Sequence, residues 1–373
     1  MWSITYGGAA GFDGFSLVPT SDGGYAVVGT ANTPDGSFIG NTDFWLFKID
    51  ASGNMEWNKT YGNPGTAYEN GRTVIVTPDG GYLLCGFAAT WPDTWLYYVD
   101  SHSWVVKTDA SGNMQWNRTY GGTYAFSMVA APDGGYAIAL DNMLVKTDAA
   151  GNMQWNKSYS GYLVVTPDGG YAMAGGAGLI KTDVQGNVQL NQTYGGTAYF
   201  SAKALVLTPD GGYAMVGQTY STVNGLNNWA YCLVKTDALG NQQWIRTYNS
   251  GRTDDWPYSL IVTPDGGYAI AGSSENIGNT IDWYYWLVKT DASGDMQWGQ
   301  TYASSGLDWA RSVVRASDGG YLISGMVSGG SCWLVKTDEN GIVPEYSSLL
   351  ASSLLLTATA FVVVNKKRLL HRR

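Results

Sequence analysis

The chain has 373 residues, with 30 acidic against 21 basic side chains and a formal net charge of −9. A nucleic-acid-binding protein needs a basic face, so this balance argues against a nucleic-acid partner. Charged and aromatic residues each make up 14% of the chain, and there are 50 glycines. That composition suits short strands, tight turns and large flat side chains packed between sheets.

The first predicted element is a strand at residues 2–7, Trp-Ser-Ile-Thr-Tyr-Gly, because aromatic and β-branched residues dominate it. The same pattern returns at residues 57–62, Trp-Asn-Lys-Thr-Tyr-Gly. At its second occurrence the pattern is the fourth strand of a longer repeating unit.

That unit is marked by the phrase Asp-Gly-Gly-Tyr, which occurs seven times and is followed each time by Lys-Thr-Asp or Lys-Ile-Asp. The phrases begin at Asp22, Asp79, Asp133, Asp168, Asp210, Asp265 and Asp318, and the matching lysines are Lys48, Lys107, Lys146, Lys181, Lys235, Lys289 and Lys336. A repeat of this length indicates a solenoid, a propeller or another array.

Each repeat predicts four antiparallel strands. In the fifth repeat these are residues 204–207, 213–216, 231–236 and 243–248, separated by Gly-, Asp- and Asn-rich turns. Four such strands are the content of a propeller blade. The phrases recur at uneven intervals, which a propeller accommodates in loops and a stacked β-solenoid tolerates poorly, so the solenoid is the weaker alternative.

The last repeat lacks its Trp-x-x-Thr-Tyr-Gly strand, and the N-terminal strand can supply it and close the ring without an exposed edge. We therefore predict an all-β fold: a seven-bladed β-propeller of four-stranded antiparallel blades over residues 1–342, closed by the N-terminal strand. Three cysteines, Cys85, Cys232 and Cys332, lie in or beside predicted strands and are interpreted as small buried hydrophobic residues.

Four Asn-x-Ser/Thr sequons lie on the predicted fourth strands, where glycans could stand in solvent. They begin at Asn58, Asn117, Asn156 and Asn191. The alternative is that Asn and Thr merely suit an exposed edge strand, and the sequence leaves both interpretations open.

The turns between the first and second strands and between the third and fourth are uniform, whereas the loops at the opposite end of the ring vary. Function usually lies on variable loops carried by a rigid scaffold. The candidate ligand-binding residues on these loops are Trp91, Trp95, Tyr97, Tyr220, Trp229, Asp255, Trp256, Asp282, Trp283, Asp308 and Trp309. Aromatic rings beside carboxylates suit sugar ligands or protein partners, and the alternative is that the rings pack the loops together.

Catalytic and metal-binding motifs are not found in the sequence. His102 and His371 are the two histidines, and no zinc helix, phosphate loop or serine-hydrolase elbow occurs. Asp254, Asp255 and Asp308 could form acid pairs for a glycosidase, but Asp beside Gly and Ser is mostly turn chemistry. We expect no enzyme activity, no cofactor and no metal site.

The C-terminal segment is apolar from Leu349 to Val364 and ends in a Lys/Arg cluster. This pattern predicts a transmembrane helix with a basic cytoplasmic tail at residues 349–373, after a short linker at residues 343–348. An amphipathic or core helix is the alternative. An exported protein carries a secretory leader, so we expect a leader upstream of Met1 or a misassigned start.

Three stretches resemble known families. Val343-Pro344-Glu345-Tyr346, the apolar segment and the basic cluster look like the PEP-CTERM and PEF-CTERM sorting signals of prokaryotic surface proteins, which implies a sortase-type processing enzyme. The repeat resembles the Asp-Gly-Gly-Tyr propellers of bacterial and archaeal surface proteins. Residues 109–116, Asp-Ala-Ser-Gly-Asn-Met-Gln-Trp, are similar to the tryptophan-docking motif of quinoprotein dehydrogenases, without a recognisable quinone site.

The docking resemblance implies that one tryptophan per repeat locks a blade to its neighbour. These residues are Trp2, Trp57, Trp116, Trp155, Trp244 and Trp298, with Leu190 as the exception in repeat four. Together the features predict a cell-surface binding propeller, membrane-anchored at its C-terminus, that recognises glycans or envelope proteins. The alternatives are a structural envelope component without a discrete ligand and, third, a glycoside-active or quinone-dependent surface enzyme.

Overall fold

The computed structural model describes residues 1–7, 12–32, 42–62, 68–90, 99–195, 199–223, 226–277, 281–304 and 306–343. The N-terminal strand is β1 (Trp2–Tyr6). Repeat one forms β2 (Phe12–Pro19), β3 (Tyr25–Asn32), β4 (Thr42–Ile49) and β5 (Met55–Tyr61). Repeat two forms β6 (Tyr68–Val76), β7 (Tyr82–Thr90), β8 (Val99–Thr108) and β9 (Met114–Tyr120). Repeat three forms β10 (Ala125–Ala130), β11 (Tyr136–Leu140), β12 (Leu144–Thr147) and β13 (Met153–Lys157).

The later repeats continue the same order. Repeat four forms β14 (Tyr162–Val165), β15 (Tyr171–Gly175), β16 (Gly178–Thr182) and β17 (Val188–Thr193). Repeat five forms β18 (Ser201–Leu207), β19 (Tyr213–Val223), β20 (Leu226–Thr236) and β21 (Gln242–Tyr248). Repeat six forms β22 (Asp255–Val262), β23 (Tyr268–Ile277), β24 (Ile281–Thr290) and β25 (Met296–Tyr302). Repeat seven forms β26 (Trp309–Arg315), β27 (Tyr321–Val327) and β28 (Ser331–Lys336).

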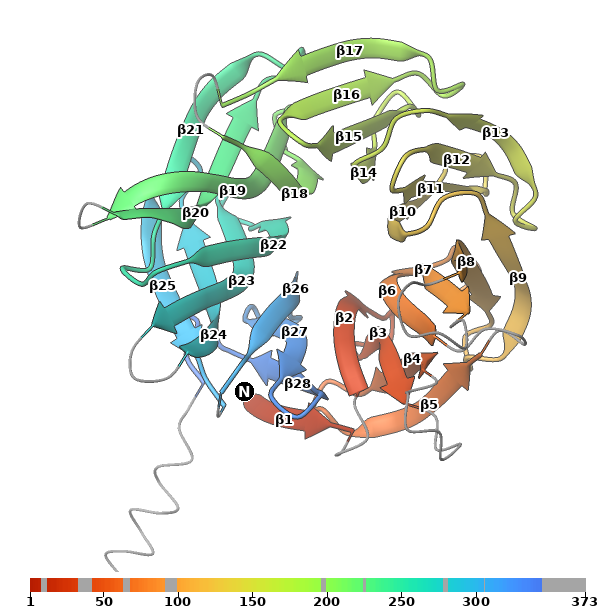
Figure 1. The fold of residues 1–373 in the computed structure, drawn as a ribbon, viewed down its shortest axis with the longest axis horizontal. Coiled ribbons are helices and arrows are strands. Elements are labelled where there is room, and N and C mark those ends of the chain that lie inside the picture. Colours follow the sequence, from red (N-terminus) through yellow and green to blue (C-terminus); the bar gives the residue numbers. More distant parts are fainter. Residues whose placement is uncertain are drawn as a thin grey trace, which may run out of the picture.

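The sheets form a closed ring, a β-propeller, in which the first strand of every repeat lies nearest the axis (Figure 1). Repeats three to six are separate four-stranded antiparallel sheets. A fifth has the order β1-β28-β27-β26, so the N-terminal strand completes the last sheet, as predicted. Trp2 lies opposite Lys336 in that pairing.

The predicted fold class is wrong in its count of separate blades. The structure has five separate four-stranded blades, and repeats one and two share one eight-stranded sheet, because Thr42 of β4 pairs in parallel with Tyr68 of β6. The described residues contain no helix, and none of them forms a helix that could cross a membrane. Residues 349–373, from which a transmembrane helix was predicted, lie outside the described part.

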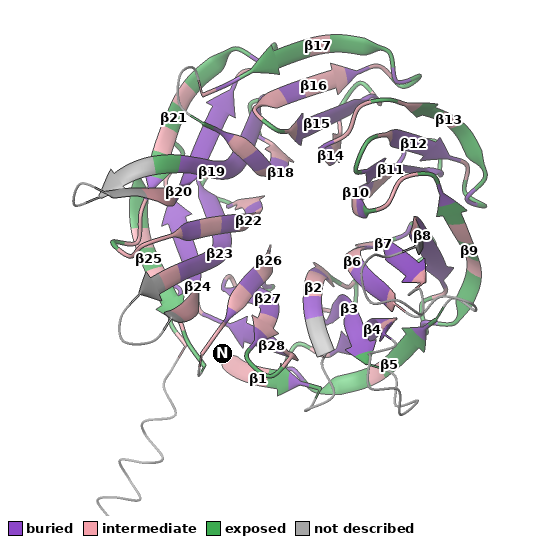
Figure 2. Ribbon diagram, viewed as in Figure 1, coloured by how far each residue is buried: buried purple, intermediate pink, exposed green. Residues whose placement is uncertain are grey.

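Burial follows strand position within each repeat (Figure 2). The second and third strands are almost completely buried: every described residue of β11 and β12 is buried. The outermost strands alternate between exposed and half-buried positions, as in β9 and β21. Cys85, Cys232 and Cys332 are buried in these layers, which confirms their interpretation as core residues.

Both glycines of the repeated phrase are required by the turn geometry. In repeat two, Gly80 has a φ of +80°, a conformation that residues with a Cβ rarely adopt. A Cβ on the next residue, Gly81, would lie 2.1 Å from the carbonyl oxygen of Thr108. The phrase therefore lets one chain segment pass directly over the end of the third strand.

This close approach brings the Asp of the phrase to the Lys of the third strand. The Lys107 ammonium donates to both carboxylate oxygens of Asp79, at 3.0 and 2.8 Å, and to the Thr108 carbonyl at 2.8 Å. A fourth bond, of 3.0 Å, reaches Gln115 on β9. The lysine side chain is buried, so one ammonium group ties two strands, β8 and β9, to the turn between β6 and β7. All seven repeats have this pair: Lys48–Asp22, Lys107–Asp79, Lys146–Asp133, Lys181–Asp168, Lys235–Asp210, Lys289–Asp265 and Lys336–Asp318.

The ion pairs lower the pKa values of the repeated carboxyl groups. Hydrogen bonds from Lys48 and Thr20 hold the pKa of Asp22 at about 2, against an ordinary value of 3.8. In Asp79 and Asp210 burial alone would raise the pKa, but hydrogen bonds from the lysine and the threonine outweigh it, so the value again falls to about 2.

We therefore expect the propeller to be destabilised by acid between about pH 4 and about pH 2. Because these folded-state pKa values lie below the unfolded value, their stabilisation is complete above pH 4 and is lost as the pH falls through 2. Melting temperatures measured at half-unit pH steps should decline most steeply in this window. A flat profile between pH 4 and pH 2 would contradict the prediction.

A second repeated contact joins each repeat to the next. The Tyr120 hydroxyl of repeat two donates to the Gly151 carbonyl of repeat three at 2.6 Å. A Cβ on Gly151 would lie 2.8 Å from the Trp116 ring, so this tryptophan lies directly on the neighbouring turn. Burial raises the pKa of Tyr120 to about 12, which keeps the hydroxyl a donor at neutral pH.

The same tyrosine bond is made at seven junctions around the ring: Tyr6–Gly53, Tyr61–Gly112, Tyr120–Gly151, Tyr159–Gly186, Tyr194–Gly240, Tyr248–Gly294 and Tyr302–Gly341. The structure places each predicted docking residue against the same glycines: Trp2, Trp57, Trp116, Trp155, Trp244 and Trp298, with Leu190 in the fourth position.

Candidate functional site

Aromatic rings from repeats five to seven lie in an unbroken row at one end of the propeller. We call this row the aromatic ladder; its members are Tyr199, Tyr220, Trp229, Trp256, Trp283 and Trp309. Successive ring centroids are 4.1 Å apart for Tyr220–Trp229 and 6.2–6.3 Å apart along the three steps from Trp229 to Trp309. Five of the six were predicted from the variable loops, and Tyr199 was not.

The ladder results from strand topology. The end of β19 and the starts of β20, β22, β24 and β26 meet at the same end of the ring, because neighbouring strands run antiparallel. Trp229 is held there by its backbone N–H, which donates to Asp254 Oδ1 at 2.8 Å. Trp283 lies opposite Glu275 in the β23–β24 pairing. Five of the six ladder residues are thus carried by paired strands, and Tyr199 precedes β18.

The exposure of the ladder falls from one end to the other. Tyr199 and Tyr220 are 51% and 52% exposed, whereas the four tryptophans are half-buried. Rings that served only to pack the loops together would not need to leave half of two tyrosines in solvent.

Two predicted ligand carboxylates have a different role. Asp255 and Asp308 are fully buried, and each accepts hydrogen bonds from the backbone N–H and the hydroxyl of a serine, Ser250 and Ser304 respectively, at 2.7–2.8 Å. Burial raises both pKa values. In the structure their oxygens hold the loops that precede β22 and β26, and neither carboxylate is exposed to solvent.

The remaining predicted residues are not members of the ladder, and some lie outside the described part. Asp282 is half-buried beside Trp283, while Trp91, Trp95 and Tyr97 lie outside the described residues. The sequon asparagines Asn58, Asn117, Asn156 and Asn191 are exposed on the outermost strands β5, β9, β13 and β17.

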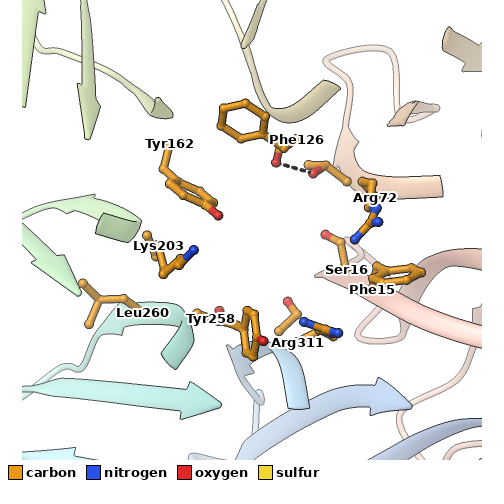
Figure 3. Close-up of a pocket in the computed structure, with 13 residues that line it drawn as sticks. Phe15, Ser16, Arg72, Phe126, Tyr162, Lys203, Tyr258, Leu260 and Arg311 are labelled. Carbon is orange, nitrogen blue, oxygen red and sulfur yellow. Dashed lines mark hydrogen bonds between the residues drawn. The ribbon is translucent and has the colours of Figure 1, made fainter. Parts of the chain in front are cut away.

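A second group of side chains surrounds the axis, and the sequence analysis did not identify it. We call it the axial ring; its members are Phe15, Arg72, Phe126, Tyr162, Lys203, Tyr258 and Arg311, one from the innermost strand of each repeat. Together with neighbouring residues they line a cavity of about 280 Å³, and Figure 3 shows the side chains converging on it.

β-Bulges direct most of these side chains toward the axis. In β18, Ala202 pairs with Gly217 and Ala204 with Val216, so Lys203 is left without a partner residue. Corresponding register shifts occur at Phe15, Arg72, Phe126, Tyr258 and Arg311. A bulge kinks the strand and re-aims the extra side chain. Repeat four has no such shift, and its Tyr162 stands at the start of β14.

The residue after the bulge fixes the innermost strands to one another. Ser127 accepts a hydrogen bond from the Leu163 N–H at 3.0 Å, and Ser259 accepts one from Val313 at 3.1 Å. The Thr73 hydroxyl donates to the Phe126 carbonyl at 2.9 Å. The axial ring is therefore carried by a hydrogen-bonded inner circle and not by separate flexible loops.

A sequence signal for the axial ring exists. Six members lie seven positions before the Asp of their Asp-Gly-Gly-Tyr phrase, and Tyr162 lies six before. Aligning the repeats on that phrase finds this column, but its residue types vary from Phe to Arg. The bulge that gives the column one common direction is visible only in the strand pairing.

Metal-binding groups are not evident in the described residues, which include no cluster of three or more His, Cys, Asp or Glu side chains suited to a metal ion. The arrangement offers aromatic surfaces at the end of the ring and cations with aromatic rings in its axis.

Comparisons with known proteins give information on the fold of the chain but not on its function. No protein-family model and no curated protein sequence matches the chain. The WD40 domain of Pan2 from Neurospora crassa is similar in structure, with a TM-score of 0.55 and 8% identity, over 87% of this chain and 88% of that domain. A protein of unknown function from Dyadobacter fermentans has a TM-score of 0.53 and 12% identity, over 90% of this chain and 98% of its own.

A third structure, of a Bacteroides caccae protein of unknown function, matches 64% of this chain and 82% of its own with a TM-score of 0.43 and 13% identity. At these identities the first two structures support the β-propeller class alone.

Proposed function

We propose that this chain is a non-enzymatic binding propeller that recognises an extended neutral glycan along the aromatic ladder. The observation that carries the proposal is the continuity of six rings across three neighbouring repeats, with two tyrosines more than half exposed. A binding site for one sugar would need one or two rings, whereas a row of six suits a linear chain of several units.

Ring chemistry supports this ligand class. The face of an aromatic ring is electron-rich, and the C–H groups on the face of a pyranose are electron-poor, so the two surfaces pack together without desolvating the sugar hydroxyls. Tilted and T-shaped neighbours, such as Trp256–Trp283 at 79°, present ring edges and faces alternately along the row.

The test is affinity electrophoresis of the full chain in gels that contain soluble β-glucan, xylan or galactomannan. We expect retardation by at least one polysaccharide, and a double variant, Tyr220→Ser with Trp229→Ala, should lose about 2 kcal/mol of binding, or roughly 30-fold in Kd. Unchanged circular dichroism would show that the variant is folded.

Tyr124→Ser is the matched control. Tyr124 is 39% exposed and precedes β10 at the same end of the ring, but it stacks on Phe87, outside the ladder. This variant should bind like the wild type. Equal loss in both variants, or no retardation by any polysaccharide, would reject glycan binding at the ladder; capture of a cell-envelope protein would instead support a protein partner for the same rings.

A further inference from the structure

The axial ring gathers positive charge in an acidic protein. Arg72, Lys203 and Arg311 come from repeats two, five and seven and line the same cavity. The other lining residues are aromatic, aliphatic, Ser or Thr, and none is acidic. In a chain with a net charge of −9, three cations around one cavity without a lining carboxylate require an explanation.

The seven repeat lysines are largely buried cations with a structural role. Each of them is paired with the Asp of its own phrase. Within the described part of the chain, by contrast, neither Lys203 nor Arg311 forms an ion pair, and the buried Nε of Arg311 has no hydrogen-bond partner there. Burial and the nearby charge of Arg311 lower the pKa of Lys203, so the two cations act on each other.

Aromatic rings hold the guanidinium groups in place. The Arg311 guanidinium carbon lies 4.3 Å from the centroid of Tyr258, and that of Arg72 lies 4.5 Å from the centroid of Phe15. Cation–π contacts orient a guanidinium group without neutralising it, so the charge of Arg311 remains available to a ligand. Tyr162 and Phe126 form the facing aromatic wall, with ring centroids 5.4 Å apart.

We propose that the axial cavity is a binding site for a small organic anion, whose carboxylate or phosphate group contacts Lys203 and Arg311 while its ring or apolar part lies against the aromatic side chains. A cavity lined by charges of one sign between low-dielectric walls concentrates the opposite charge. Arginine suits both groups because its planar donors match the oxygens of carboxylate and phosphate. The volume of about 280 Å³ admits a molecule of roughly one ring.

The site is separate from the ladder in its residues and its ligand, but the two adjoin. Trp256 and Trp309, both ladder members, precede Tyr258 and Arg311 by two residues on β22 and β26. The axial site therefore lies on the same innermost strands as two rings of the ladder, while its lining residues and its ligand class differ from those of the ladder.

The experiment is isothermal titration calorimetry of the full chain with four probes: benzoate, phenyl phosphate, inorganic phosphate and the uncharged benzyl alcohol. We expect saturable binding of benzoate or phenyl phosphate, weaker binding of inorganic phosphate, and no comparable binding of benzyl alcohol. A preference for benzoate or for phenyl phosphate identifies the carboxylate or the phosphate as the natural group. Equal binding of benzyl alcohol, or no binding of either aromatic anion, would overturn the proposal.

Two variants and one control test whether the anion binds in the axial cavity. Lys203→Met and Arg311→Gln should each raise the Kd of the bound anion roughly tenfold or more, since each removes a charged donor. Arg246→Gln removes the same charge from the outer strand β21, where Arg246 pairs with Asp295, and should leave the Kd unchanged. Equal losses in all three variants would indicate nonspecific charge attraction and reject the site.

The melting temperature measured without ligand distinguishes a binding role of Lys203 from a structural one. Lys203→Met removes an ammonium group that faces Arg311 without an ion-pair partner in the described residues, so the ligand-free melting temperature should stay the same or rise. The anion-induced increase in melting temperature should disappear. A lower ligand-free melting temperature together with an unchanged anion effect would overturn the proposal, and glycan retardation should be unaffected in either variant.

Discussion

Replacement of Trp116 with alanine should reduce the free energy of unfolding by about 3 kcal/mol. The ring packs on Gly151 of the next repeat, lies 6.1 Å from Tyr136 between ring centroids, and carries Arg118 over its face at 5.6 Å. Alanine would leave a cavity at the junction of two blades, where neither neighbour can collapse into it. Urea unfolding followed by circular dichroism measures the loss.

Two further variants provide reference values for this loss of unfolding free energy. Trp116→Leu copies repeat four, where Leu190 occupies the same position against Gly240, and should recover part of the loss. Tyr120→Phe removes one hydroxyl bond to Gly151 and should cost about 1 kcal/mol. Because the junction lies away from the ladder, ligand binding should survive in all three; lost binding with unchanged stability would contradict the separation of scaffold from binding surface.

The second large effect is expected from Asp133→Ala, which should destabilise the protein by about 3 kcal/mol. Lys146 is 1% exposed and donates to both carboxylate oxygens of Asp133, at 2.9 and 2.7 Å. Without the carboxylate, a buried ammonium keeps only the neutral acceptors Thr147 and Gln154. Since Asp133 itself is about half exposed, the estimate is at the low end for a broken buried pair.

A double-mutant cycle distinguishes this mechanism from simple loss of contacts. Lys146→Met removes the buried charge and leaves Asp133 to be solvated, so it should cost less than Asp133→Ala. Adding Asp133→Ala to Lys146→Met should then cost little more. Additive losses would show that the two groups stabilise the blade independently. Asp133→Asn, which preserves the acceptor for the Gly135 N–H, separates the turn from the ion pair.

The paired Asp and Lys also explain why the repeat phrase is so uniform while the loops are not. The Asp-Gly-Gly turn must pass over the third strand at a distance that excludes a Cβ, and the lysine must reach a carboxylate, a carbonyl and a glutamine at once. These geometric requirements explain why the same residue types recur at the same positions of the repeat. At the opposite end of the ring, strand pairing continues into longer hairpins such as β19–β20, where the side chains are free to differ.

Much of the architecture was determined by the sequence alone. Glycines and aromatic runs define strands and turns locally, so the strands of each repeat and the closure by β1 could be predicted from short windows. The junction tryptophans could be inferred from a recurring motif. The shared sheet of repeats one and two could not, because one parallel pair, Thr42–Tyr68, joins segments that no local pattern relates.

The sites depended more on tertiary structure. The aromatic residues of the variable loops were recognisable by composition, but only the meeting of strand ends showed that Trp229, Trp256, Trp283 and Trp309 form one row and that Tyr199 joins it. Burial of Asp255 and Asp308 depends on loop closure around serines several residues away. Exposure is a property of the packed molecule, so a carboxylate beside a tryptophan cannot be assigned to solvent or core from the chain alone.

The axial ring shows most clearly which features the sequence determines and which depend on the tertiary structure. Its column stands at a fixed distance from the repeated phrase in six repeats, so its positions were present in the sequence, and its three cations were visible as residue types. Their convergence was decided by β-bulges and by ring closure, which bring Arg72, Lys203 and Arg311 from distant repeats to one axis. Local propensities determine strands and turns, whereas the electrostatics of a site arise only when closure places those strands around a common space.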